Sequence, residues 1–304
     1  MPRGIDTRLP FFAYGLFKPD QLGFEKIASL VDGRPKFACV SGELWERDGI
    51  PLLRPVRGHG QVWGALLDFG QRQADEGYAE IESIEPSDQY RWEKVAATLD
   101  DGTTVFANAL VGRQPTHGGR LLETAEWDGR RDPFFTTVFE IVQSDLAAAP
   151  ASASDPNDSS PILRLQMTYL LLWSSVERFC TLRYSLRKMR DDSILRRILR
   201  LAVEPAFVSM VESRAGAIKE NMRRIYRADD PDGAAAPTTP NEVPPEKVLK
   251  YLYTIRSNIA HRGKESMHDY ELLRGCTDVL LTAFRAVLES SFERAKGADR
   301  RRRR

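Results

Sequence analysis

The sequence predicts two domains, a small α+β domain with a curled or barrel-like sheet followed by an all-helical bundle. Short β-rich runs fill the first half of the chain, and after about residue 160 the apolar residues recur with helical spacing. A segment rich in Ala, Ser, Asp and Pro, without large apolar side chains, separates the two patterns. At 304 residues the chain is long enough for two separate cores.

Strand-like runs in the first half are bounded by Gly, Pro and Asp turns. Asp100, Asp101 and Gly102 separate two of these runs and predict a tight hairpin. The expected strands are residues 9–14, 36–45, 61–69, 91–99 and 104–111, and the expected helices are residues 21–31 and 78–84.

The second half predicts a bundle of four or five helices with short connections. An apolar stripe begins at Leu163, and the strongest series with i, i+3, i+4 and i+7 spacing runs over residues 272–288. Pro205, Pro244 and Pro245 fall at expected helix starts, where a missing backbone N–H costs little. The remaining expected helices cover residues 194–203, 207–226 and 246–260.

The net charge of +1 conceals opposite charges in the two halves. Residues 1–160 hold 16 basic and 25 acidic side chains, a net charge of −9, whereas residues 161–304 hold 28 and 18, a net charge of +10. A basic half attracts a phosphate backbone, although five arginines at 300–304 supply half of this excess. We expect a first domain at 1–145, a linker at 146–161, a helical domain at 162–295 and a basic tail at 296–304.

Several bulk features restrict the class of protein. No apolar run reaches the roughly 18–20 residues that cross a bilayer, and the first residues lack the apolar core of a secretory signal. Cys39, Cys180 and Cys276 are too widely spaced for a metal site or a disulfide framework. We therefore expect a cytoplasmic protein without membrane partners, with buried free thiols.

A guanidinium and an imidazole lie close together in the sequence at the end of an expected helix, in the segment Arg256-Ser257-Asn258-Ile259-Ala260-His261. Arginine can hold a phosphate bidentately and stabilise the charge of a transition state. Histidine can exchange protons near neutral pH with the attacking or leaving oxygen. Metal-free cleavage of a phosphodiester needs these two groups.

The surrounding segment, residues 251–263, resembles the signature of HEPN domains, particularly the Apea-like branch, together with the earlier helix at 169–179. The resemblance covers most of residues 161–295 and implies a helical bundle that forms a homodimer, with the two motifs meeting across the interface. Many such domains are metal-independent endoribonucleases, whereas others bind RNA or serve as scaffolds. The family often places Asn, Asp or His directly after the arginine, and here the residue is Ser257.

Carried over by position, Arg256 would hold the scissile phosphate and His261 would act as acid or base. Ser257 or Asn258 could orient either group, and Glu177 is a candidate to pair with Arg256. Residues five apart lie about 140° apart around a helix, so the two groups converge better if His261 lies past the helix end or if two subunits contribute. RNA binding without cleavage, and a structural role with His261 near a helix C-terminus, remain alternatives.

The first half carries an ordered set of short motifs: Tyr14-Gly15-Leu16-Phe17, Gly42-Glu43-Leu44, Gly49-Ile50-Pro51, Glu85-Pro86 and Tyr90-Arg91-Trp92. This order resembles the gamma-glutamylcyclotransferase-like family, over roughly the first 140 residues. That family opens with a strand and a Tyr-Gly-Ser/Thr turn, has Gly-X-Leu and Gly-X-Pro elements, and carries a Leu-Asp-X-X-Glu-Gly segment before Tyr-X-Arg.

The resemblance implies an intramolecular aminolysis that converts a γ-glutamyl compound into 5-oxoproline and an amine. Glu85 would be the base, residues 14–17 (Tyr14, Gly15, Leu16 and Phe17) would supply backbone N–H donors, and Tyr90 would line the pocket. Such a ring closure needs a base, an oxyanion donor and proximity, and no metal or other cofactor.

Two positions depart from the family pattern. Leu16 replaces the Ser/Thr after Tyr-Gly, which removes a hydroxyl but keeps the backbone N–H. Pro86 replaces the Gly after the glutamate and restricts Glu85 to extended backbone geometry. Either an active cyclotransferase or a degenerate domain that senses a γ-glutamyl ligand is compatible with these changes.

Together the two resemblances favour a cyclotransferase-like domain fused to a HEPN domain that cleaves or binds RNA, with a conditional toxin or defence effector as the role that analogy suggests. One alternative is a cyclotransferase whose helical half only dimerises it. The other is a binding protein in which both sites are inactive.

Overall fold

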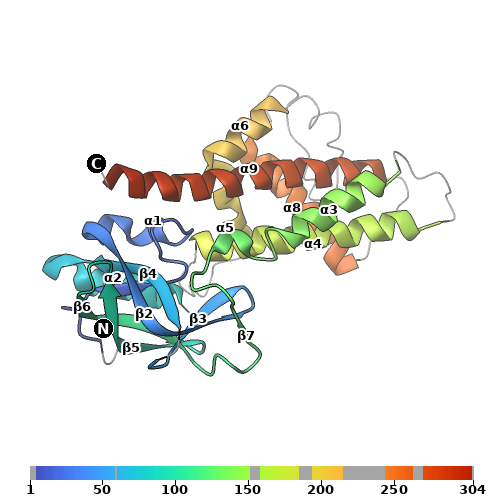
Figure 1. Cartoon of the computed structure of the whole chain (residues 1–304). Helices are drawn as coiled ribbons and strands as arrows, with labels where there is room; N and C mark the ends of the chain where they lie inside the picture. Colours follow the sequence, from blue (N-terminus) through green and yellow to red (C-terminus); the bar gives the residue numbers. More distant parts are fainter. Residues whose placement is uncertain are drawn as a thin grey trace. The chain divides into compact units, whose positions relative to one another are not determined.

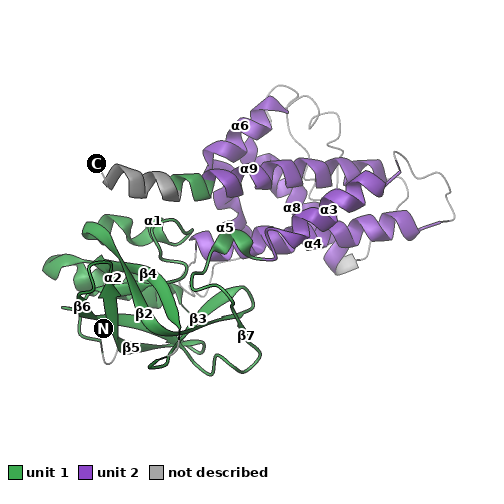
Figure 2. Ribbon diagram, viewed as in Figure 1, with its two compact units in different colours: residues 1–132, 185–188, 291–304 green, residues 133–184, 189–290 purple. Residues whose placement is uncertain are grey.

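The computed structural model describes residues 5–58, 60–85, 87–150, 158–184, 194–214, 244–262 and 270–302, with side chains described to residue 260 in the helix that ends at 262 and to residue 294 in the last one. The chain divides into two compact units (Figures 1 and 2). Unit 1 comprises residues 1–132, 185–188 and 291–304, and unit 2 comprises residues 133–184 and 189–290.

Unit 1 is built around a sheet that closes on itself. Its order is β3-β2-β4-β1-β6-β5, and β2 also pairs with β5, so that β2, β4, β1, β6 and β5 form a five-stranded barrel. All pairs are antiparallel except β1 with β6, which is parallel. The strands are β1 (Phe11–Ala13), β2 (Asp32–Arg47), β3 (Ile50–Pro55), β4 (Gln61–Asp68), β5 (Tyr90–Leu99), β6 (Thr104–Gly112) and β7 (Arg120–Leu121).

The expected barrel-like α+β domain is confirmed, with local differences in its elements. The helix expected at 78–84 begins earlier, at Gly70, and the short strand β7 was not expected. The strand β3 was not expected, because Pro51 and Pro55 weaken its strand pattern; it lies at the sheet edge, where proline is tolerated. The expected helix at 21–31 is reduced to α1 (Phe24–Ile27) and the 3-10 helix η1 (Ala28–Leu30).

One long helix of unit 1, α2 (Gly70–Ile84), covers the barrel core and leads to the candidate site. It buries Ala74, Gly77, Tyr78 and Ile81. The Tyr78 ring makes edge contacts with Phe11, Phe69 and Trp92 at centroid distances of 6.5, 5.4 and 5.4 Å. These contacts fix the helix end, and therefore the residue that follows it, relative to β1.

The described part of unit 2 is helical. The expected helix at 207–226 is described only in α6, and residues 215–226 lie outside the described residues. Pro205 and Pro245 are the first residues of α6 and α8, as expected. The helices are α3 (Thr137–Ala148), α4 (Ser160–Tyr184), α5 (Ile194–Ile198), η3 (Leu199–Val203), α6 (Pro205–Ser213), α8 (Pro245–Arg262) and α9 (Tyr270–Arg302).

Four phenylalanines form the centre of unit 2. The Phe284 ring on α9 lies 6.4 Å from the Phe135 ring, 5.5 Å from Phe139 on α3 and 5.6 Å from Phe179 on α4. Because these contacts tie α3 to the helices, the compact division falls at 132/133, whereas the sequence places the first domain boundary at residue 145. The expected linker at 146–161 contains the end of α3 and the start of α4, and residues 151–157 lie outside the described residues.

Three further observations concern chemistry that the fold permits. The three cysteines are free and buried, as expected. Among the described residues there is no group of three or more His, Cys, Asp or Glu side chains able to hold a metal ion. Within the same ranges, no helix combines the length and apolarity needed to cross a membrane.

Candidate functional site

A small cavity lies in unit 1 where β1 ends and the chain turns towards α1. Its volume is about 20 Å³, which is close to the space that one water molecule needs. It is lined by Phe11, Ala13, Tyr14, Gly15, Leu16, Phe17, Pro51, Glu85, Tyr90 and Leu110. The cavity therefore brings together all the residues that the sequence nominated for cyclotransferase chemistry.

Glu85 is the charged residue among those that line this cavity. It caps the C-terminus of α2 with φ −81° and ψ 135°, the extended geometry expected for a residue before proline, and its N–H donates to the Ile81 carbonyl at 3.1 Å. The residue is half-buried, and desolvation of its carboxyl group raises the pKa to about 8 from an ordinary value of 4.5. A carboxyl group with such a pKa exchanges protons close to neutral pH.

Two tyrosines shape the walls of the cavity. The Tyr14 hydroxyl donates to the Leu110 carbonyl at 2.6 Å and accepts from the Leu53 N–H at 3.0 Å, and burial raises the pKa of Tyr14 far above its ordinary value. The Tyr90 hydroxyl donates to the Pro51 carbonyl at 2.7 Å. Since both hydroxyl protons are engaged with carbonyls, these tyrosines position the strands around the cavity and do not act as acids.

The backbone of Gly15, Leu16 and Phe17, which we call the donor loop, forms the third wall. Within the described residues, no hydrogen bond occupies the N–H groups of these three residues, whereas the Gly15 carbonyl accepts from the Lys18 N–H at 3.0 Å. A Cβ on Gly15 would lie 2.6 Å from Pro51 Cγ, so only glycine fits there. The three residues therefore line the cavity and have backbone N–H groups without a partner in the described part of the chain.

The departure at Leu16 does not disturb the loop. Its side chain is 9% exposed and packs against Gly23, where an added Cβ would lie 2.7 Å from Leu16 Cγ. Its carbonyl accepts from the Gly23 N–H at 3.0 Å. The hydroxyl expected from the family pattern is absent, and the backbone N–H remains.

The arginine motif of unit 2 lies on α8. Arg256 donates to Glu177 of α4 at 2.9 Å, so the suggested pairing is present, with side chains 22% and 28% exposed. The Arg256 guanidinium also lies 5.8 Å from the centre of the Tyr253 ring. Ser257 is half-buried and Asn258 is buried.

Helix α8 continues to Arg262, so His261 lies within the helix. Convergence of its imidazole with Arg256 in one subunit would be easier if the histidine lay past the helix end. The side chain of His261 lies outside the described residues, as do residues 263–269. The convergence of the Arg256 guanidinium and the His261 imidazole therefore stays a prediction from sequence.

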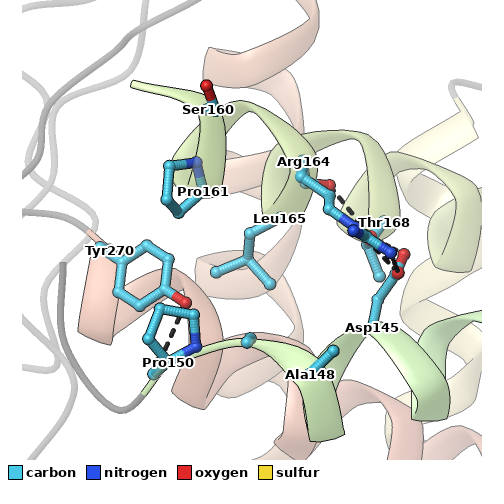
Figure 3. A pocket seen from close by; sticks show the side chains of 10 residues that line it. Asp145, Ala148, Pro150, Ser160, Pro161, Arg164, Leu165, Thr168 and Tyr270 are labelled. Atoms are coloured by element: carbon cyan, nitrogen blue, oxygen red, sulfur yellow. Dashed lines mark hydrogen bonds and ion pairs between the residues drawn. The ribbon is translucent and has the colours of Figure 1, made fainter. Parts of the chain in front are cut away.

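A larger cavity in unit 2, of about 250 Å³, was not expected from the sequence (Figure 3). Asp145 on its wall accepts from Arg164 at 3.0 and 2.5 Å and from Thr168 at 2.7 Å. Burial alone would raise the pKa of Asp145, but these hydrogen bonds outweigh it and hold the pKa below its ordinary value. The Tyr270 hydroxyl donates to the Pro150 carbonyl at 3.0 Å. These polar groups already have partners, and the cavity suggests no reaction.

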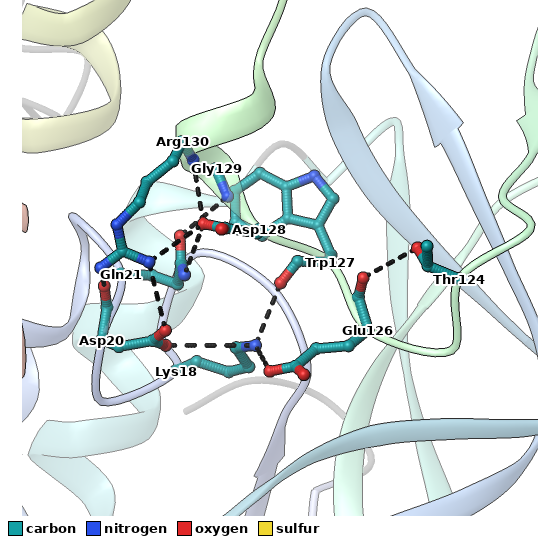
Figure 4. A network of polar contacts seen from close by, with 9 residues as sticks. All are labelled: Lys18, Asp20, Gln21, Thr124, Glu126, Trp127, Asp128, Gly129 and Arg130. Carbon is teal, nitrogen blue, oxygen red and sulfur yellow. Dashed lines mark hydrogen bonds and ion pairs between the residues drawn. The ribbon is translucent and has the colours of Figure 1, made fainter.

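The sequence also missed a polar network next to the donor loop, centred on the buried Lys18 (Figure 4). Lys18 contacts Glu126 and the Trp127 carbonyl, residues more than a hundred positions away along the chain. Lys18 immediately follows the Tyr-Gly motif, but no local pattern indicates partners so distant in sequence.

A known protein family matches the part of the chain that contains the small cavity. Residues 11–129 match the family described as gamma-glutamyl cyclotransferase, AIG2-like. Searches of curated proteins and of solved structures found no match. The first unit thus contains a cyclotransferase-like domain, and the second is helical.

Proposed function

We propose that the cyclotransferase-like domain releases 5-oxoproline from a γ-glutamyl compound, with Glu85 as the proton-transfer group. The observation that carries this proposal is the placement of a carboxyl group of pKa about 8 at a cavity lined by three consecutive residues whose backbone N–H groups have no partner among the described residues. A proton-transfer group works best when its pKa lies near the working pH.

In the proposed reaction Glu85 takes a proton from the α-ammonium group of the substrate. The freed amine attacks the γ-carbonyl carbon, a new C–N bond closes the five-membered ring, and the carbonyl oxygen becomes an oxyanion. The N–H groups of the donor loop stabilise that oxyanion. Protonated Glu85 then gives its proton to the leaving nitrogen as the original amide bond breaks. The regenerated carboxylate takes the second proton from the ring nitrogen and passes it to the departing amine, which leaves 5-oxoproline, an alkylammonium product and ionised Glu85.

Two features of the cavity bear on this reaction. A substrate ammonium beside Glu85 favours the carboxylate form and brings its pKa down towards neutrality. The cavity of about 20 Å³ holds about one water, so a glutamyl group requires Leu16, Phe17 or Pro51 to move outward. Binding and opening of this wall are therefore coupled.

We expect the rate of 5-oxoproline release at low substrate concentration to rise with pH towards an apparent pKa of about 8, because Glu85 of the free protein is protonated below that pH. The increase amounts to about tenfold per pH unit well below the pKa. A panel of γ-glutamyl amines incubated at pH 5–9, with 5-oxoproline quantified by mass spectrometry, measures the profile. A rate independent of pH between 6 and 8 would contradict the assignment.

A second candidate function belongs to the helical unit, which we propose cleaves or binds RNA without a metal. The half-buried pair of Arg256 with Glu177 supports it, since the carboxylate holds the guanidinium in a fixed orientation. The Nε atom of Arg256 is buried and has no hydrogen-bond partner within the described residues. A guanidinium oriented in this way can donate hydrogen bonds to a phosphate, and His261 would supply the acid or base.

We expect RNA incubated with the protein in EDTA to be cleaved, and cleavage to fall by about 10²–10⁴-fold in His261→Ala and to be lost in Arg256→Ala. Arg164→Ala is the matched control, because that arginine also pairs with a carboxylate, Asp145, but at the cavity of about 250 Å³. Gel electrophoresis of labelled RNA measures the effect. Intact RNA in the wild-type reaction excludes cleavage, and a filter-binding assay then decides whether RNA is bound.

If neither RNA cleavage nor RNA binding is found, a homodimer through the helical unit is the remaining proposal for its role. Light scattering after size exclusion measures that state directly. A conditional toxin or defence effector, in which the cyclotransferase-like domain senses or modifies a γ-glutamyl compound, is the biological role that we propose by analogy with fused families.

A further inference from the structure

A buried network joins residues 18–21, which follow the donor loop, to residues 124–130 of the same unit (Figure 4). Lys18 is 4% exposed, and its Nζ contacts the Glu126 carboxylate, the Trp127 carbonyl at 3.0 Å and Asp20 at 4.0 Å. Gln21, 1% exposed, accepts from the Gly129 N–H at 2.9 Å. We call these contacts of Lys18 and Gln21 the loop clamp.

The distant half of the clamp is itself fixed to the barrel. The Leu122 N–H donates to the Leu44 carbonyl of β2 at 2.8 Å, and the Ala125 carbonyl accepts from the Trp63 N–H of β4 at 2.8 Å. Trp127 is buried in the barrel core. The segment at 122–127 therefore has little freedom to move relative to the strands.

The near half of the clamp fixes the donor loop. The Lys18 N–H donates to the Gly15 carbonyl at 3.0 Å, and the Lys18 carbonyl accepts from the Gln21 N–H at 2.9 Å. These two hydrogen bonds close turns that begin at Gly15 and at Lys18. Because the first turn contains Gly15, Leu16 and Phe17, a shift of Lys18 would change the direction of their N–H groups. A continuous path of contacts thus runs from the barrel strands to the candidate oxyanion site.

The energetics argue against a purely structural role. Burying an ammonium group is costly and is offset here by the Glu126 carboxylate, the Trp127 carbonyl and the more distant Asp20 carboxylate. An apolar side chain of similar shape can often replace such an arrangement without loss of stability. Glu126 is 56% exposed in its side chain, so water can solvate it if Lys18 is removed. A lysine at this position contributes more to orientation than to net stability.

We propose that Lys18 is a positioning residue that aims the donor loop at the reacting carbonyl of the substrate. The inference rests on the proposed release of 5-oxoproline from γ-glutamyl compounds. It adds a residue that acts on the oxyanion through the backbone of Gly15–Phe17 and does not itself touch the reacting atoms.

The test compares Lys18→Met, Lys18→Arg and the matched control Lys36→Met, whose lysine is exposed on β2. We expect Lys18→Met to lower kcat for 5-oxoproline release by about 10–100-fold, because misplacement by about 1 Å costs that much, with KM changed less than about threefold. Lys18→Arg should recover part of kcat, and Lys36→Met should match the wild type. The apparent pKa of the rate should stay that of Glu85 in all variants.

A second measurement does not depend on turnover. Deuterium exchange of a peptide covering residues 15–24, in which the N–H groups of residues 18, 21 and 23 donate to the carbonyls of residues 15, 18 and 16, should be at least about tenfold faster in Lys18→Met, while exchange in α2 stays unchanged. Unchanged kcat, or a loss of activity that only follows a lower melting temperature, would overturn the positioning role, as would unchanged exchange in the loop. A wild-type protein without activity would instead refute 5-oxoproline release, and the positioning role with it. An active wild type that is unaffected by Lys18→Met would refute the positioning role alone.

Discussion

We expect Glu85→Gln to abolish 5-oxoproline release and, in the same molecule, to raise the free energy of unfolding at alkaline pH. Loss of a general acid–base group lowers kcat by about 10²–10⁴-fold. The amide cannot take the proton of the α-ammonium group, although it fills the same space beside the donor loop. Residual turnover near that of the wild type would remove Glu85 from the reaction.

The stability effect follows from the raised pKa of Glu85, about 8 in the folded protein against 4.5 unfolded. Between these values the folded state binds more protons, so the wild type loses stability as pH rises from about 4.5 to 8 and levels off above that. Glutamine removes this loss. The difference amounts to about 2–4 kcal/mol at pH 9, from about 1.4 kcal/mol per pKa unit with an allowance for partial exposure.

Urea unfolding followed by tryptophan fluorescence at pH 5, 7 and 9 measures this effect. The matched control is Glu82→Gln, which lies on the exposed side of the same helix. The advantage of Glu85→Gln over the wild type should grow with pH, and Glu82→Gln should show no such trend. An advantage that is constant with pH would mean that Glu85 ionises normally.

We expect Phe284→Ala to destabilise unit 2 by about 3–5 kcal/mol, which is the range for removing a buried aromatic ring. The ring is 2% exposed and contacts three other phenylalanines from separate parts of the unit. No side chain nearby can fill the space, because its neighbours are rigid rings. Thermal unfolding followed by circular dichroism at 222 nm, where helices dominate, measures the loss.

Met167→Ala is the matched control, since Met167 lies on α4 with 73% of its surface exposed. It should change the unfolding free energy by less than about 0.5 kcal/mol. A loss below about 1 kcal/mol for Phe284→Ala would show that the phenylalanine cluster is not the core of the unit. The same experiment on Phe139→Ala tests whether α3 belongs to that core.

Local signals predicted the parts of the fold that local chemistry determines. The hairpin between β5 and β6 forms where Asp101 and Gly102 indicate it, with Gly102 at φ 81° and Thr98 paired with Thr104. The first-domain boundary expected at residue 145 stays a prediction. It rests on the change of composition at residue 146, whereas the compact units divide at 132/133 and the Phe139 ring contacts Phe284 of α9. Such contacts join residues far apart in sequence and leave no local trace.

The candidate site shows the same division. Its members could be nominated from sequence, since Tyr14, Gly15, Glu85 and Tyr90 belong to an ordered set of motifs, and all four line one cavity. The raised pKa of Glu85 and the contact of Lys18 with Glu126 could not, because each depends on burial among residues that the chain brings together only by folding.

The two prolines of β3 have a further consequence. Strand β3 pairs with β2 on one side, and on its other side the Leu53 N–H and the Pro51 carbonyl bond the Tyr14 and Tyr90 hydroxyls. Pro51 and Pro55 lack N–H groups, so neither position can donate to a further strand. Pro51 also lies over Gly15 at the cavity wall, so one ring both withholds a backbone donor and limits access to the carboxyl group inside.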